Sequence, residues 1–233
     1  MNSLTIIITA SFIPSHPSIK IIQETIESLQ LINIPPNTKI ILAHDYSNNK
    51  NYIKYLNRLK EYIKLYSNIK IVERNSHGHL VGNIRNALKY VKSKYILVIQ
   101  HDLPFIRNFN VANVISDMEE NRRVKHVRFN KRNNIKIKTD AHNELFGLQV
   151  KQSNYTYTRT PGWSDNNHLC LTSYYNDIIM KECKDGGAME DTLFNKSVNK
   201  KTHRRYGTYL FGELNHPQII KHTDGRKTQP IKD

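Results

Sequence analysis

The sequence is poor in cysteine and has no long apolar run. Cys170 and Cys183 are its only cysteines and form no C-x-x-C pair, so neither a disulfide framework nor a cysteine-bound zinc ion is expected. The opening MNSLTIIITASFIPS lacks a basic leader, and its apolar run is too short for a signal peptide or a membrane span. These absences predict a soluble protein with no membrane span, located in the cytoplasm.

Three common catalytic signatures are also absent. No G-x-G-x-x-G follows the first apolar run, and neither G-x-x-x-x-G-K-[ST] nor G-x-S-x-G occurs. The chain has only 9 glycines in 233 residues, and TASFIPSHPS, which follows the first strand, contains none. Dinucleotide oxidoreductases, P-loop phosphotransferases and α/β-hydrolases therefore lose support. A nucleotidyltransferase is kept as an alternative, although its glycine-rich phosphate loop is missing.

Acidic residues are much scarcer than basic ones. There are 20 Asp and Glu against 35 Lys and Arg, which gives a net charge of +15. Such a balance is compatible with nucleic acid, an anionic membrane or a phosphorylated ligand. The densest basic stretches are 121–138 and 199–207, and stretches of this kind usually only solubilise a protein. A nucleic-acid-binding protein that uses 121–138 remains an alternative, but no recognised binding module supports nucleic acid as a partner.

The first hundred residues alternate between two hydrophobic periods. Apolar, β-branched runs predict strands over 4–9, 39–45, 68–72 and 94–100, and stripes of helical period predict helices between them. This order predicts right-handed crossovers and an α/β fold with a doubly wound, mostly parallel central sheet. After residue 118 the regularity weakens, and an edge strand is expected within 154–163. We expect this smaller, mixed part to form a second wall of one domain.

Polar residues stand where three of the predicted strands end. Ligands of open α/β sheets bind outside the carboxyl ends of the strands, so these residues should converge on one crevice. Asp102 could hold Mg²⁺ or Mn²⁺ together with diphosphate oxygens, or could simply cap a turn. The three groups are Thr9-Ala10-Ser11, His44-Asp45 and Gln100-His101-Asp102.

Three further segments could carry chemistry. In GGAMEDTLF, Glu190 and Asp191 begin a predicted helix behind a Gly-Gly pair that could let a loop close; one could be a general base, or both could only complement the helix dipole. Trp163, Ser164 and Asp165 could bind a sugar, although a packed turn is an equal alternative. The segment SHGH (76–79) resembles a metal clip, but an exposed turn is the better interpretation. His216 and His222 could each reach the crevice from the C-terminal segment.

Taken in order, these features resemble the GT-A fold glycosyltransferases. The resemblance is to family-2-like inverting enzymes and to small glycosyltransferase domains of large DNA viruses, and it covers about residues 4–225. Its most specific segment is VGNIRNALKYVKSKYILVIQHD (81–102), which ends where the family has a metal-binding D-x-D. A single domain over 1–233 is implied, with a nucleotide-sugar-binding half (1–102), an acceptor-binding half (103–225) and a tail (226–233). For a viral protein the location would be the host cytoplasm.

The resemblance also implies roles for residues. Asp102 matches the last Asp of D-x-D, whereas Gln100 replaces the first, which leaves fewer carboxylates for Mn²⁺ or Mg²⁺. Asp191 matches the usual base, with Glu190 beside it, and His222, rather than His216, matches a histidine that completes the metal shell. The donor nucleotide would be held by Thr9, Ala10, Ser11, Asp45, Arg85, Asn86, Gln100 and His101.

The implied reaction moves a sugar from a nucleotide-diphospho-sugar to a hydroxyl of a glycan or other acceptor. UDP is the nucleotide that the resemblance favours, and GDP and dTDP stay open. The acceptor hydroxyl would attack the anomeric carbon in line, so the expected stereochemical outcome is inversion.

Overall fold

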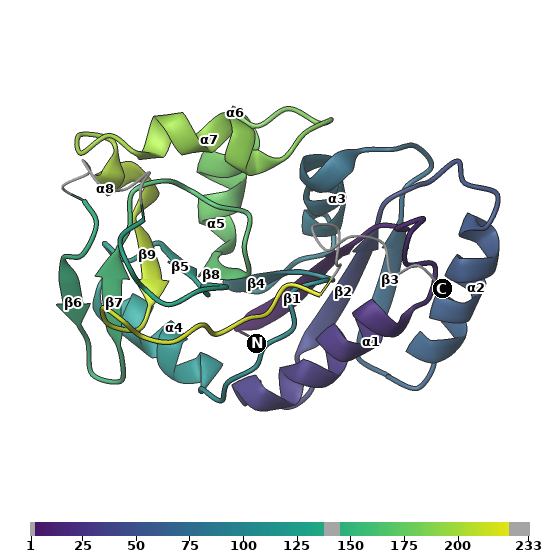
Figure 1. Cartoon of the computed structure of the whole chain (residues 1–233), viewed down its shortest axis with the longest axis horizontal. Helices are drawn as coiled ribbons and strands as arrows, with labels where there is room; N and C mark the ends of the chain where they lie inside the picture. Colours follow the sequence, from purple (N-terminus) through teal and green to yellow (C-terminus); the bar gives the residue numbers. More distant parts are fainter. Residues whose placement is uncertain (1–2, 138–144, 224–233) are drawn as a thin grey trace.

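The protein is built around one mixed sheet. The computed structural model describes residues 3–137 and 145–223, and in them the sheet has nine strands in the order β3-β2-β1-β4-β8-β5-β9-β7-β6 (Figure 1). Four parallel strands form its first part: β1 (Leu4–Ala10), β2 (Lys39–His44), β3 (Ile69–Glu73) and β4 (Tyr95–Gln100). The α/β class and these four strands are confirmed, each to within one residue at either end.

The second part of the sheet is shorter and mixed. It contains β5 (His126–Arg128), β6 (Gln149–Lys151), β7 (Thr156–Arg159), β8 (His168–Leu171) and β9 (Thr208–Phe211). β8 runs antiparallel between β4 and β5, and β5 pairs in parallel with β9. The expected edge strand, β7, instead pairs on both sides, and the edge is β6. β6 has three residues that face mostly solvent, so no hydrophobic pattern in the sequence predicted this strand.

Helices cover both faces of the sheet. On one face lie α1 (Lys20–Glu27), η1 (Ser28–Ile32), α2 (Tyr52–Ile63) and α4 (Val111–Glu120). On the other lie α3 (His79–Leu88), α5 (Thr172–Tyr174), η3 (Tyr175–Ile179), α6 (Met180–Glu182) and α7 (Met189–Ser197), with α8 (His203–Tyr206) leading into β9. No helix in the described part of the chain is both long and apolar enough to cross a membrane.

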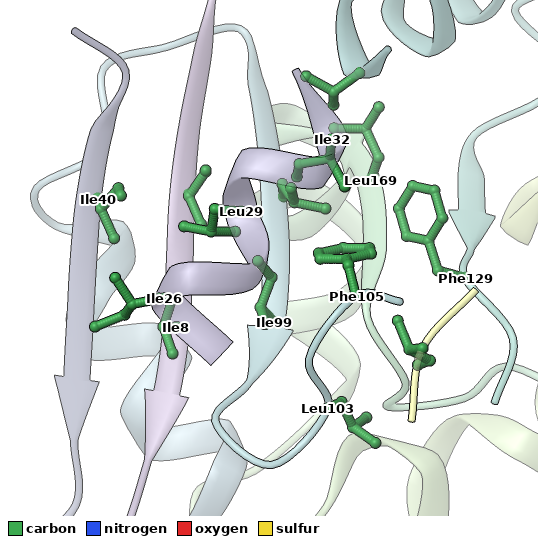
Figure 2. Close-up of a cluster of buried hydrophobic side chains, with 14 of the residues drawn as sticks. Ile8, Ile26, Leu29, Ile32, Ile40, Ile99, Leu103, Phe105, Phe129 and Leu169 are labelled. Carbon is green, nitrogen blue, oxygen red and sulfur yellow. The ribbon is translucent and has the colours of Figure 1, made fainter. Parts of the chain in front are cut away.

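Burial on both faces explains the continuous apolar run of β1. Successive side chains of a strand point to opposite faces. Ile6 and Ile8 therefore join the core beneath α1 and α2, and Ile7 joins the core beneath α3. Figure 2 shows Ile26 beside Ile8, with Leu29 in the same core farther along the sheet. A run of this kind is typical of a parallel strand that helices cover from both sides.

Two histidines are completely buried in these packing layers. The His44 ring packs against Tyr52 and Tyr55 of α2, so it turns away from the carboxyl edge where it was expected. The His168 ring stacks on Tyr175, and its Nε2 lies 2.6 Å from the Tyr175 hydroxyl oxygen. Burial lowers the pKa of each imidazole from 6.5 to about 4.

Mild acid should therefore destabilise the protein. Between pH 6.5 and 4 the unfolded chain binds more protons at these histidines than the folded chain does, so stability falls as the pH falls. From pH 7.5 to pH 5, each histidine should remove about 2 kcal/mol from the free energy of unfolding. Denaturant unfolding at both pH values measures the loss. His44→Phe should lose about 2 kcal/mol less than the wild type, and equal losses would contradict the assignment.

Candidate active site

A crevice of about 340 Å³ lies at the carboxyl ends of β1, β2 and β4. The strand ends converge there, as expected for a parallel sheet. Its lining includes seven residues assigned above to donor or metal: Thr9, Ala10, Ser11, Asp45, Gln100, His101 and Asp102. Four more lining residues come from α3 and the turn before it: His77, His79, Leu80 and Asn83.

Asp45 is buried and caps the start of α3. Its Oδ1 accepts bonds from the backbone N–H groups of Gly78 at 2.9 Å and Tyr46 at 3.0 Å. Its Oδ2 accepts the His79 N–H at 3.0 Å and lies 2.8 Å from His77 Nδ1. A helix N-terminus leaves such N–H groups without partners inside the helix. Because both oxygens are engaged, a nucleoside base that bonds Asp45 would have to share Oδ2 with His77.

The C-terminal segment returns to the end of β4, as the yellow trace in Figure 1 shows. The Thr223 backbone N–H donates to the Asp102 carbonyl oxygen at 2.9 Å, and His222 Nε2 lies 3.3 Å from Asp102 Oδ2. His216 lies elsewhere, with its ring edge-on to Phe211 in a separate hollow of about 700 Å³. Of the two candidate histidines, the structure brings His222 to Asp102.

This pair of side chains fits a divalent cation. Carboxylate and imidazole are both ligands of Mn²⁺, and Mg²⁺ commonly takes one or two carboxylates together with phosphate oxygens. Two adjacent ligands about 2.1 Å from one ion lie about 3 Å apart, close to the separation between Asp102 and His222. Within residues 3–137 and 145–223, no group of three or more His, Cys, Asp or Glu side chains could hold a metal ion. Other positions would fall to nucleotide oxygens or water.

Glu190 and Asp191, in the first turn of α7, have different surroundings. Glu190 Oε2 accepts the Ser164 hydroxyl at 2.9 Å and the Asp165 backbone N–H at 3.1 Å. The Glu190 backbone N–H in turn donates to Asp165 Oδ2 at 3.2 Å. Asp191 is exposed to solvent. Glu190 is therefore committed to holding the 164–165 turn, and Asp191 is the carboxylate of the two that an incoming substrate can reach.

Asp165 is an unusual carboxylate because it is buried among other acids. Its side chain is almost fully buried, and its Oδ1 has no hydrogen-bond partner. Burial, together with the charges of Glu190 and Asp191, raises the pKa of Asp165 from 3.8 to about 7. Asp165 thus has little contact with solvent and serves as an acceptor for the start of α7. Ser164 and Asp165 are both buried, so they could bind an acceptor only through the few atoms of this turn that reach solvent.

Arg85 and Asn86, expected near the donor nucleotide, do not line the crevice. Arg85 Nε donates to Asp185 Oδ1 at 2.8 Å, and its NH2 group donates to the Cys183 carbonyl oxygen at 2.6 Å. Asn86 Nδ2 donates to the Glu73 carbonyl oxygen at 3.3 Å. The expectation is corrected here: Arg85 ties α3 to the loop before α7. Carbonyl oxygens about a hundred residues away along the chain hold its guanidinium in place.

The loop before α7 is bonded to the start of α3. The Gly186 N–H donates to the Gly78 carbonyl oxygen at 3.4 Å, and the Val81 N–H donates to the Gly187 carbonyl oxygen at 3.2 Å. Gly186 has φ of 100°, which favours glycine. In this conformation the Gly-Gly pair shapes a docked turn that leads into α7, and the closing motion expected from it stays a prediction.

Trp163 does not offer its ring to a sugar. The side chain is completely buried, and its Nε1 donates to the Tyr174 hydroxyl at 3.2 Å. The ring also packs against His126 and His168. Stacking of an acceptor on Trp163 is therefore wrong for this structure, and the packed-turn alternative is correct. An aromatic ring beside polar residues looks the same in sequence whether it faces the core or a ligand.

His77, His79 and Asn83 line the crevice although no sequence pattern assigned them to it. The rings of His77 and His79 lie 4.2 Å apart between centroids, and His79 has φ of 53°, an unusual conformation for a residue other than glycine. Asn83 Nδ2 lies 3.4 Å from the Ala10 carbonyl oxygen. The SHGH motif was the available signal, but it indicated an exposed turn. Its place beside Asp45 follows from the capping of α3.

Solved structures of glycosyltransferases share this fold. Residues 1–349 of S. aureus TarS in complex with UDP-GlcNAc match with a TM-score of 0.57 at 14% identity, over 98% of this chain and 60% of that one. The mannosyltransferase PcManGT from Pyrobaculum calidifontis, in complex with GDP-Man and Mn²⁺, matches with a TM-score of 0.58 at 11% identity, over 97% and 58%. This chain thus spans about three fifths of each of these two solved chains, and 36% of the longer solved chain of TarS. A search of curated proteins finds no match.

The sequence itself matches a family of known chemistry. The family described as glycosyl transferase family 2 matches residues 11–179, well over half of the chain. That match includes β2 to β4, most of the residues that line the crevice and Asp102, and it agrees with the fold shared with TarS and PcManGT. The chain therefore belongs to glycosyl transferase family 2 and has the GT-A fold of a glycosyltransferase.

Proposed function

We propose that this glycosyltransferase moves a sugar from a UDP-sugar to a hydroxyl of a glycan or other acceptor, with a divalent cation bound and with inversion at the anomeric carbon. The crevice at the ends of β1, β2 and β4 holds the nucleotide, and α7 presents the base. Family membership favours glycosyl transfer over the nucleotidyltransferase and nucleic-acid-binding alternatives.

One observation carries the proposal: the metal-binding candidates and the base candidate belong to one bonded unit. Asp102 and His222 meet at the end of β4, two residues after Gln100. Gln100 Nε2 donates to the Asp165 carbonyl oxygen at 2.7 Å, and Asp165 bonds to Glu190, the neighbour of Asp191. These bonds connect the end of β4 to the first turn of α7, which supports a cation site and a base that act on one bound donor.

In the proposed reaction, Asp191 acts as the base, and Asp102 and His222 act on the leaving group through the cation. Asp191 accepts the proton of the acceptor hydroxyl as that oxygen attacks the anomeric carbon, and the bond to the nucleotide β-phosphate oxygen breaks on the opposite side. A bound divalent cation supplies positive charge near the departing diphosphate. Asp102 and His222 would hold that ion. General-base catalysis of this kind typically contributes about 10²–10⁴-fold to the rate.

The solved neighbours support the donor class. TarS binds UDP and UDP-GlcNAc, and PcManGT binds GDP-Man together with Mn²⁺. Both donors are nucleotide-diphospho-sugars, so the diphosphate is the shared chemistry. The choice of UDP for this chain rests on the resemblance described above, as does inversion. The likeness to viral glycosyltransferase domains also stays a prediction.

Calorimetric titration of UDP, GDP and dTDP into the protein, with and without Mn²⁺, tests the proposal. We expect UDP to bind most tightly and Mn²⁺ to strengthen its binding at least about tenfold, which corresponds to about 1.4 kcal/mol. Proton NMR of the product sugar then reports the anomeric configuration. Failure of all three nucleotides to bind, together with salt-sensitive binding to DNA or RNA, would favour the nucleic-acid alternative.

A further inference from the structure

Gln100 stands where the family has the first Asp of its D-x-D motif. Its side chain is bonded to the protein backbone. Its Nε2 donates to the Asp165 carbonyl oxygen at 2.7 Å, and its backbone N–H donates to Asn167 Oδ1 at 3.0 Å. Asn167 Nδ2 in turn donates to the Leu103 carbonyl oxygen at 2.7 Å. The end of β4 is thus bonded on both sides of Asp102 to the 165–167 turn.

The same turn holds the start of α7. Asp165 and Glu190 bond reciprocally, backbone N–H to side-chain oxygen in each direction, at 3.1 and 3.2 Å. No side chain within α7 itself caps its N-terminus. Asp165 supplies that cap from outside the helix, and caps of this kind orient the first turn of a helix. Asp191 lies in that first turn.

An aspartate at position 165 is energetically unfavourable. Its side chain is about nine-tenths buried, and its Oδ1 has no hydrogen-bond partner. A buried carboxylate with an unsatisfied oxygen destabilises a fold, and such residues often persist because a function needs them. An amide on Gln100 is complementary to the Asp165 carbonyl oxygen, whereas a carboxylate there would bring two acceptors together.

We propose that Gln100 and Asp165 are positioning residues that hold the first turn of α7, and with it Asp191, against the end of β4. Gln100 is then a connector in this chain and does not substitute for a lost metal ligand. The inference rests on the proposed function only in giving Asp191 the role of base, because the bonded connection itself can be measured without activity.

The first test is Gln100→Asp, which restores D-x-D in the sequence. We expect kcat to fall about tenfold or more, because a hydrogen bond is lost and a carbonyl oxygen is left facing a carboxylate. The affinity for UDP with Mn²⁺ should change by less than about threefold, since Asp102 and His222 are retained. Hydrogen exchange of the Glu190 amide, which donates to Asp165 Oδ2, should become at least about tenfold faster.

Matched variants separate positioning from general damage. Asn68→Asp makes the same amide-to-acid change at a residue whose Nδ2 donates to the Thr38 carbonyl oxygen at 2.9 Å, at the far edge of the sheet. It should leave kcat and the exchange of the α7 amides unchanged. Asp165→Asn keeps an acceptor for the Glu190 N–H and should keep slow exchange, whereas Asp165→Ala should lose it.

The outcomes decide between two roles for Gln100. A rise in Mn²⁺ affinity and in kcat for Gln100→Asp, with unchanged exchange in α7, would show that Gln100 is a weakened metal ligand and would overturn the proposal. Fast exchange in both Gln100→Asp and Asp165→Ala supports it. If the wild type transfers no sugar, the proposed function fails, while the exchange data still decide the structural connection.

Discussion

Asp191→Asn should abolish sugar transfer while sparing donor binding. We expect kcat to fall about 10²–10⁴-fold, the usual contribution of a general base, because an amide cannot take a proton from the acceptor hydroxyl. Asp191 is exposed in the first turn of α7. Glu190 cannot replace it easily, since its Oε2 is already occupied by the Ser164 hydroxyl and the Asp165 N–H. Initial rates and calorimetric binding of UDP measure the two effects separately.

Two further variants sharpen the comparison. Asp177→Asn changes another exposed carboxylate, paired at 3.7 Å with Lys181 on the same face of the sheet, and should leave kcat unchanged. Glu190→Gln removes the charge but keeps an acceptor for the Ser164 hydroxyl, and should cost less than Asp191→Asn. Comparable turnover by Asp191→Asn and the wild type would sink the assignment of Asp191 as base.

The part of the site that the sequence predicted well is the part built by strand ends. Hydrophobic period places β1, β2 and β4, and the geometry of parallel sheets then places Ser11, Asp45 and Asp102 at one edge. The prediction needed no knowledge of side-chain direction, because the backbone alone brings these residues together. His222 was preferred to His216 because HTDGR follows an apolar run; the structure brings it to Asp102, and its role as a metal ligand stays a prediction.

The sequence did not predict the side-chain directions of Arg85, Trp163 and His44. Arg85 lies on α3, and only the folded position of α6 and the residues that follow it, up to Asp185, decides that it turns there rather than toward the crevice. Trp163 faces the core because α5 brings Tyr174 and β8 brings His168 beneath it. His44 is the last residue of β2 but points into the layer beneath α2, since neighbouring residues of a strand face opposite sides. Local sequence carries no information about the partners that fix Arg85 and Trp163.

Asp102→Ala should remove the effect of Mn²⁺ on nucleotide binding. In the described residues Asp102 is the carboxylate that accompanies His222, and its side chain is almost fully buried at the end of β4. A single carboxylate and an imidazole make a weak site without the nucleotide, so the ion and the diphosphate should bind together. The variant should therefore show equal affinity for UDP with and without Mn²⁺, as measured by calorimetric titration.

The sign of the effect without metal distinguishes a metal ligand from a merely structural residue. When no cation is present, the Asp102 carboxylate repels the diphosphate, so Asp102→Ala should bind UDP somewhat more tightly than the wild type in chelator. A structural defect would weaken binding under both conditions. His222→Ala should reduce the gain from Mn²⁺ by about tenfold, equivalent to 1.4 kcal/mol, while His216→Ala, in its separate hollow, should not. Equal losses from both histidine variants would mean that neither residue holds the ion and that the segment acts only by closing over the end of β4.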